Sequence, residues 1–172
     1  DEYCKQKGIE LIPCIQTLAH IRNIFRYSVY DSVRDFGDIL LIDEPRTYEL
    51  IENMFSTLAE CFTSRKVHIG MDEAFMVGFG NYRTKHGICD RYDLLVRHLN
   101  KVVEIAKKYN FHPMMWSDMF FRMSNNGEYY VNKTEIPEDV ISKIPDVSLV
   151  YWDYYHSDEK IYCLSTAVSS GI

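Results

Sequence analysis

The 172-residue sequence predicts an α/β fold, and more specifically about half of a (β/α)8 TIM barrel. Three observations support this prediction. Short apolar runs alternate with segments of helical period, which is typical of βαβ units in a parallel sheet. The apolar runs lack polar alternation, so we expect strands that are covered on both faces. Polar and aromatic side chains gather directly after each run, where parallel α/β folds bind their ligands.

The first half of the chain is expected to hold a helix end, a strand and a long helix. Residues 1–7 are expected to end a helix, because Gly8 after them suits the left-handed position that closes many helices. The apolar run 9–16 predicts the first strand. Residues 44–62 then repeat apolar side chains at helical spacing, and Pro45 suits the first turn of this helix.

The second half continues the alternation. An acidic residue, Asp90, is placed to cap the helix that follows it. In chain order we expect a strand over 66–71, a helix from Asp90 to Tyr109, a strand over 112–117, a short helix near 137–143 and a strand over 147–152.

Two architectures fit this order of elements, a doubly wound sheet and a TIM barrel. No GxGxxG or P-loop motif follows a strand, which disfavours the nucleotide-binding versions of the first. Site-like side chains at four strand ends favour the barrel: residues 16–20, 72–73, 116–118 and 152–155. A complete barrel takes about 250 residues. Residues 1–172 are therefore expected to be a fragment of a single (β/α)8 catalytic domain from a longer protein.

Composition and charge narrow the possible partners. The net charge of −6 gives no reason to expect nucleic acid, and no apolar run approaches the roughly 20 residues of a membrane span. The six histidines show no HExxH or HxxxH spacing, so a metal site is not expected. No organic cofactor is implied either. Five cysteines without a CxxC pair are expected to be reduced. The chain opens with Asp1 and Glu2 instead of a signal peptide, and a cytoplasmic location is expected.

The segment "HIGMDE", residues 68–73, ends in two adjacent acids, Asp72 and Glu73. Successive side chains of a strand face opposite sides, so both acids can reach one pocket only if the backbone turns there. Gly70 makes such a turn easy. The simpler alternative is that one acid caps the next helix while the other is solvated. Two carboxylates are also the usual machinery of glycosidases. In the common retaining scheme the second carboxylate is a nucleophile from another strand. Adjacent acids instead fit an acid beside a residue that orients a nucleophile supplied by the substrate.

Four segments resemble glycoside hydrolase family 20, the β-N-acetylhexosaminidases, and especially its small exo-acting bacterial-type branch. The resemblance implies barrel strands three to six. It also implies an exo-acting enzyme that removes terminal β-linked GlcNAc or GalNAc from glycans, with retention, through a substrate-assisted oxazolinium intermediate. The segments are "HIGMDEAFMVGFGNYRTKHG" (68–87), which resembles the family signature, "ELIPCIQTLAHI" (10–21), which resembles the third strand, "MMWSDMFFR" (114–122), the fifth, and "LVYWDYY" (149–155), the sixth.

The resemblance also implies roles for individual positions. The catalytic group comprises Glu73 as general acid and base, Asp72 as acceptor of the substrate's acetamido N–H, and His20, which steadies the acid. The partner of His20 is expected on strand two, outside the chain. The substrate-binding group comprises Trp116 and Trp152 as walls for the sugar ring, Asp118 as a hydroxyl ligand or supporting group, and Tyr154 as an acetamido contact.

Some positions depart from the family pattern. Met71 stands where much of the family has glycine, "TLAH" replaces a commoner Pro-Gly-His turn, and the sugar-gripping arginine of strand one is missing. His68 is interpreted as a buried, hydrogen-bonded histidine. Two alternatives remain, a glycan-binding or inactive hexosaminidase-like domain and another barrel glycosidase. The 172 residues by themselves are expected to be inactive, because strands that would complete the barrel and its site are missing.

Overall fold

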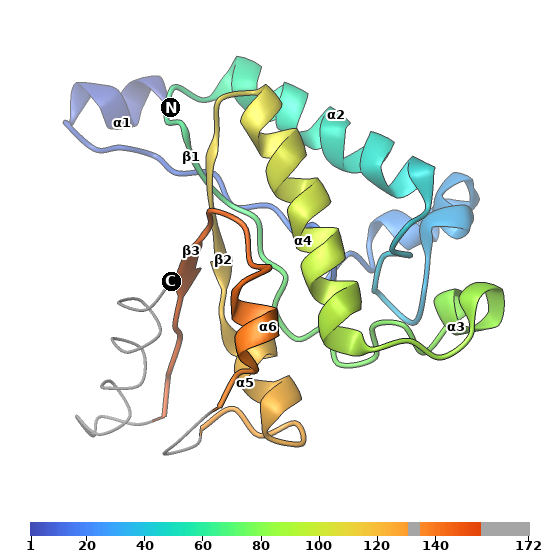
Figure 1. Cartoon of the computed structure of the whole chain (residues 1–172). Helices are drawn as coiled ribbons and strands as arrows, with labels where there is room; N and C mark the ends of the chain where they lie inside the picture. Colours follow the sequence, from blue (N-terminus) through green and yellow to red (C-terminus); the bar gives the residue numbers. More distant parts are fainter. Residues whose placement is uncertain (131–134, 156–172) are drawn as a thin grey trace.

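The computed structural model describes residues 1–130 and 135–155, in which short parallel strands alternate with helices (Figure 1). The two longest elements are helices that lie side by side. In chain order the elements are α1 (Glu2–Gln6), the 3-10 helices η1 (Ile24–Arg26) and η2 (Ser28–Val33), α2 (Pro45–Cys61), β1 (Lys66–His68), α3 (Asn81–His86), α4 (Arg91–Lys108), β2 (His112–Trp116), α5 (Asp118–Ser124), α6 (Glu138–Ile141) and β3 (Ser148–Val150).

The three named strands form a parallel sheet in the order β1-β2-β3. A further extended segment, residues 13–17, lies beside β1. His68 N–H donates to the Pro13 carbonyl at 2.9 Å, and the His68 carbonyl accepts from Ile15 N–H at 2.8 Å. Parallel extended segments therefore follow one another across the sheet in the order in which they occur along the chain.

The first predicted strand is shorter than the expected 9–16. Cys14 makes only an isolated parallel bridge with His68, and residues 9–12 belong to no strand. Ile9 N–H donates instead to the Cys4 carbonyl, as part of the end of α1, and Gly8 there has the predicted left-handed φ of 69°. The amino end of the apolar run is thus occupied in closing the helix before it.

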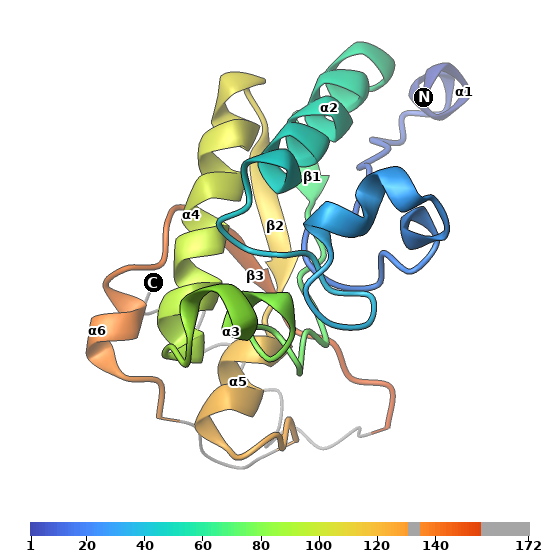
Figure 2. The same ribbon diagram turned by 90° about the vertical axis from the view of Figure 1, so that its right-hand side faces the viewer.

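The order of the strands can be compared with the two architectures that the sequence allows. A doubly wound sheet reverses its strand order at a switch point, whereas a barrel keeps neighbours in chain order. Among the strands of residues 1–130 and 135–155, this order has no reversal. Helices α2 and α4 contact each other and lie on the same side of the sheet, as the two perpendicular views show (Figures 1 and 2). Both features agree with part of a barrel wall.

Helices α2 and α4 form where their sequences predict them. Pro45 occupies the first turn of α2, and Ile51 and Phe55 of its apolar face are fully buried. The Asp90 side chain caps α4 by accepting a hydrogen bond from Asp93 N–H at 3.0 Å. The apolar stripe of α4 is buried at Leu94, Leu95, Leu99, Val102, Val103 and Ala106. Burial of these stripes against the sheet contributes a large part of the core, which also includes buried residues of the loops and strands.

Two findings concern the predicted partners and cysteines. Within residues 1–130 and 135–155, none of the helices combines the length and apolar composition that a membrane crossing requires. Cys4, Cys14, Cys61 and Cys89 are free thiols, while Cys163 lies outside the described residues.

Candidate active site

The backbone leaves the direction of β1 just before the two adjacent acids. Gly70, Met71 and Glu73 have φ values of 70°, 71° and 53°, all in the left-handed region. A Cβ atom on Gly70 would lie 2.0 Å from Gln16 Oε1 and 3.0 Å from the Ile15 carbonyl oxygen, so a larger residue would displace the Gln16 side chain, and glycine also accepts the positive φ freely. The turn predicted from Gly70 is therefore confirmed, and it lets Asp72 and Glu73 face the same cavity.

One cavity of about 370 Å³ lies beyond the carboxyl ends of the strands. Its volume is within the range of small-molecule sites. The structure brings the predicted site residues together here, with the exception of Asp118. It adds Tyr155, for which the sequence predicts no individual role. The lining residues are His20, Asp72, Glu73, Trp116, Trp152, Tyr154 and Tyr155.

His20 contacts both acids. Its Nε2 lies 3.2 Å from Asp72 Oδ2 and 3.6 Å from Glu73 Oε2. Its other ring nitrogen, Nδ1, lies 4.0 Å from Asp38 Oδ2, so an acid of this same chain faces the position for which a partner on strand two was expected. Gln16 Nε2 donates to the other carboxylate oxygen of Asp72 at 3.1 Å. Gln16 belongs to the predicted site-like residues 16–20 but has no individual role there, whereas Asp38 is brought to the site only by the folded chain.

Two tryptophans form aromatic walls, and each is supported from behind. The Trp116 ring packs against His68 with centroids 4.3 Å apart. His68 is 7% exposed and accepts a hydrogen bond from Gly70 N–H at 3.1 Å, which confirms its interpretation as a buried, bonded histidine. Its burial lowers the pKa of His68, so the neutral ring is favoured. The Trp152 backbone N–H donates to the buried Tyr129 hydroxyl at 3.1 Å.

Asp118 lies beneath Glu73 and does not line the cavity. It is completely buried, and its Oδ2 accepts the Glu73 backbone N–H at 3.1 Å. Burial raises the pKa of Asp118 to about 6, although the Glu73 hydrogen bond and Arg122 oppose this shift. Of the two roles that the resemblance offers, this placement favours a supporting group over a ligand of sugar hydroxyls.

The loop after the acids is held by a second buried carboxylate, Asp35. Its two oxygens accept hydrogen bonds from Gly78 N–H and Tyr82 N–H, each at 2.7 Å. A Cβ atom on Gly80 would lie 2.1 Å from the Asp35 carbonyl oxygen, so the loop approaches closely because this residue is glycine. Asp35 thus fixes the segment that leads from the acids to α3.

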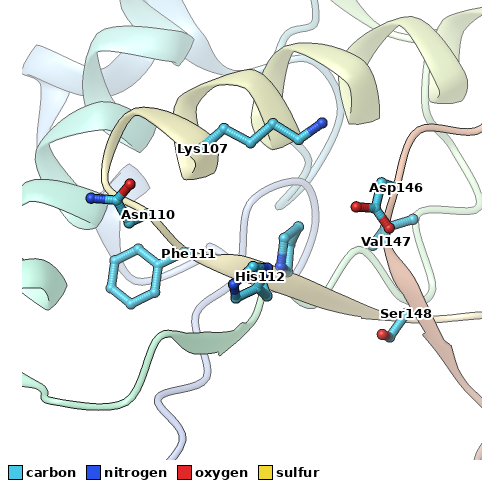
Figure 3. Close-up of a pocket in the computed structure, with 8 residues that line it drawn as sticks. Lys107, Asn110, Phe111, His112, Asp146, Val147 and Ser148 are labelled. Atoms are coloured by element: carbon cyan, nitrogen blue, oxygen red, sulfur yellow. The ribbon is translucent and has the colours of Figure 1, made fainter.

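A second cavity, of about 390 Å³, lies at the opposite ends of the strands (Figure 3). His112 and Ser148, which begin β2 and β3, line it together with Lys107 and Asp146. None of the predicted site residues reaches this cavity. Among the residues that the structure describes, no group of three His, Cys, Asp or Glu side chains is arranged to hold a metal ion.

Comparison with known proteins identifies the family. The model of "Glycosyl hydrolase family 20, catalytic domain" matches residues 2–153. Human Hexosaminidase D is 24% identical over 158 residues, a match that covers 85% of this chain and 30% of that protein. The chain therefore spans about a third of the length of this relative.

Solved structures show the same fold. The crystal structure of Dispersin B has a TM-score of 0.63 at 18% identity, covering 95% of this chain and 44% of that chain. The exo-β-N-acetylglucosaminidase of Vibrio harveyi, solved in complex with N-acetylglucosamine, has a TM-score of 0.63 at 17% identity. The match covers 96% of this chain and 25% of that chain. The family's catalytic domain is a TIM barrel, with which the parallel sheet agrees. The chain belongs to glycosyl hydrolase family 20.

Proposed function

We propose that the complete protein is an exo-acting β-N-acetylhexosaminidase that releases terminal β-linked GlcNAc or GalNAc with retention. Residues 1–172 would supply strands three to six of its single catalytic barrel. The observation that carries this proposal is that Asp72 and Glu73, adjacent in sequence, face one cavity between Trp116 and Trp152, with His20 in contact with both acids.

In the first step Glu73 acts as general acid. It donates its proton to the glycosidic oxygen while the carbonyl oxygen of the substrate's 2-acetamido group attacks C1. The bond between C1 and the leaving oxygen breaks, the aglycone departs as an alcohol, and a cyclic oxazolinium ion remains. The substrate supplies the nucleophile, so no second carboxylate has to lie on the opposite side of the sugar. This explains why the two acids can be neighbours in the chain.

Asp72 stabilises the positive charge that develops during this step. Its carboxylate accepts the acetamido N–H, which orients the carbonyl toward C1, and its negative charge stabilises the oxazolinium ion. Gln16 and His20 hold the two oxygens of Asp72 and so restrict its rotation. In the second step Glu73, now a carboxylate, takes a proton from water as the water oxygen attacks C1. The bond between C1 and the acetamido oxygen breaks, which opens the oxazolinium ring and restores the 2-acetamido group of the released sugar. Two successive inversions at C1 give overall retention.

The aromatic walls suit the proposed substrate. Trp116 and Trp152 present flat apolar faces on which the C–H groups of a sugar ring can pack, while the acids take its polar groups. Tyr154, for which the resemblance implies an acetamido contact, and Tyr155 also line the cavity and are largely exposed. The crystallised Vibrio harveyi relative binds N-acetylglucosamine, which supports this substrate class for the complete protein.

The test compares an aryl N-acetyl-β-glucosaminide with the matching aryl β-glucoside, using the complete protein. Only the first should be a good substrate, because only it carries the internal nucleophile. Asp72→Asn should lower kcat for it by about 10²–10³-fold, with a smaller effect on KM, since the charge acts mainly in the transition state. Comparable turnover of both glycosides would exclude the substrate-assisted mechanism. Binding of glycans without any turnover would instead favour a lectin-like domain.

A further inference from the structure

The backbone of Glu73 is held in an unfavourable conformation. Its φ of 53° lies in the left-handed region, as does that of Met71 at 71°. Residues with a Cβ atom rarely adopt this conformation, and they keep it only where neighbouring groups enforce it. The Glu73 side chain is 38% exposed, so burial of that side chain does not supply the constraint. Some other contact must hold the residue in place.

Within its own loop, the Glu73 carbonyl accepts a hydrogen bond from Phe75 N–H at 2.8 Å. The anchor from another part of the chain is Asp118. Its Oδ2 accepts the Glu73 backbone N–H at 3.1 Å, although 45 residues separate the two in sequence. Asp118 is completely buried and begins α5 directly after β2. The hydrogen bond therefore connects the chain leaving β1 with the chain leaving β2, on the side of Glu73 away from the cavity.

Arg122 holds Asp118 in turn. It lies one turn later on α5, with Nε 3.6 Å from Asp118 Oδ2. Its guanidinium lies over the rings of Phe75, at 4.8 Å, and Tyr129, at 5.3 Å, and donates to the Gly127 carbonyl at 2.9 Å. These contacts hold the Arg122 guanidinium in a fixed position beside Asp118. Its positive charge therefore favours the ionised form of the Asp118 carboxyl group, which burial disfavours.

We propose that Asp118, held by Arg122, is a positioning residue for acid catalysis that aims the Glu73 carboxyl group at the glycosidic oxygen through the Glu73 backbone. This inference rests on the proposed function. Removing the acceptor would release the left-handed turn and move the carboxyl group from its working position. A displacement of about 1 Å can lower a rate by about 10²-fold. The Trp152 side chain, a wall of the cavity, also acts on the Asp118 carboxylate as a hydrogen-bond donor. The loss should therefore fall mainly on the protonation step, with a smaller part on sugar binding.

The experiment uses the complete protein and two substrates that share the sugar but differ in the leaving group. An alkyl N-acetyl-β-glucosaminide needs a proton from Glu73, whereas a dinitrophenyl glycoside departs with little acid help. Asp118→Ala should lower kcat on the alkyl glycoside by about 10²-fold and on the dinitrophenyl glycoside by less than about 10-fold. KM should stay within about 3-fold for both. Asp118→Asn keeps an acceptor oxygen and should recover part of the difference.

Asp35 provides the matched control. It is also a buried carboxylate that accepts backbone N–H groups, but those belong to Gly78 and Tyr82, not to the acid. Asp35→Ala should lower activity on both substrates by the same factor, through loss of folded protein. An equal loss on both substrates in Asp118→Ala would overturn the proposal. If that variant does not fold, the same ratio in Asp118→Asn decides. A wild type inactive on both substrates would refute the proposed function instead.

Discussion

The two ends of the sheet carry cavities of similar size but differ in how their backbones are built. At the amino end, the turn between α4 and β2 uses Asn110 at φ 58°, a residue type that tolerates the left-handed region. At the carboxyl end, Met71 and Glu73 occupy the same region without that tolerance. The cavities measure about 390 and 370 Å³, so volume does not tell them apart. Residues placed against their own conformational preference support the proposal that the carboxyl end is the functional one.

The left-handed φ values of Met71 and Glu73 lower the stability of the fold, and other contacts must compensate for them. Each residue held in a sparsely populated region costs about 1–3 kcal/mol. Met71 offsets this by complete burial, and Glu73 by its hydrogen bond to Asp118. At the amino end no such compensation is needed, because Asn110 suits its position. The carboxyl end keeps side chains for chemistry, and the surrounding structure restrains them.

The largest expected effect is a difference in enzyme activity between variants at the carboxyl-end cavity and variants at the amino-end cavity. In the complete protein, Glu73→Gln should lower kcat on an alkyl N-acetyl-β-glucosaminide by about 10²–10⁴-fold, which is the usual contribution of a general acid. Asp146→Asn changes an acid that lines the amino-end cavity and should leave kcat and KM unchanged. Steady-state kinetics of both variants provide the measurement. A large loss in Asp146→Asn would give the amino end a role that the comparison denies it.

The next effect uses two buried groups behind the carboxyl end, His98 and Asp118. Burial lowers the pKa of His98 to about 4, so stability is lost as pH falls from about 6.5 to 4 while the unfolded chain takes up the proton. Burial raises the pKa of Asp118 to about 6, so stability is gained as pH falls from about 6 to 4. Each group changes the free energy of unfolding by about 3 kcal/mol over this pH range, and the two changes have opposite signs.

Asp118→Asn should therefore expose the acid sensitivity that His98 causes. Between pH 6.5 and 4, its free energy of unfolding should fall by about 3 kcal/mol more than that of the wild type. Urea unfolding at the two pH values measures the difference, and groups common to both proteins cancel. Parallel pH profiles would mean that Asp118 is already ionised throughout this range.

The smallest effects test the conformational contrast itself. Met71→Gly relieves the left-handed strain but removes a fully buried side chain, and the free energy of unfolding should fall by about 1–4 kcal/mol. Asn110→Gly changes an exposed residue that is already suited to its φ, and stability should rise by no more than about 0.5 kcal/mol. Thermal unfolding of both variants gives the comparison. A stabilised Met71→Gly would show that strain outweighs packing there.

The sequence predicts α2 and α4 closely because each has a long apolar period and a recognisable start, at Pro45 and Asp90. It predicts the first strand poorly. Apolar content alone does not reveal that Ile9 closes a helix and that pairing begins only at Pro13. Short strands in general take their limits from their neighbours in the sheet, which local patterns do not contain.

Around the cavity, the residues that the sequence does predict follow strands directly, and parallel strands bring such positions to one edge. The contacts that restrain those residues do not follow from the sequence in this way. Asp118 reaches Glu73 across 45 positions and Asp35 reaches Gly78 across 43, and no spacing rule relates such pairs. The resemblance indicates which residues are candidates for chemistry, but only the folded chain shows which buried acids restrain them.

His98 has a practical consequence for engineering of the outer helices. It is buried on α4, where its ring bonds to the Thr17 carbonyl at 2.9 Å and to the Tyr48 hydroxyl at 3.1 Å. Thr17 lies in the segment that carries His20 to the cavity. Replacing His98 with an apolar residue would remove its hydrogen bonds to the Thr17 carbonyl and the Tyr48 hydroxyl and would loosen the segment that carries His20. Directed evolution of this layer should keep position 98 constant and vary exposed positions such as Glu104.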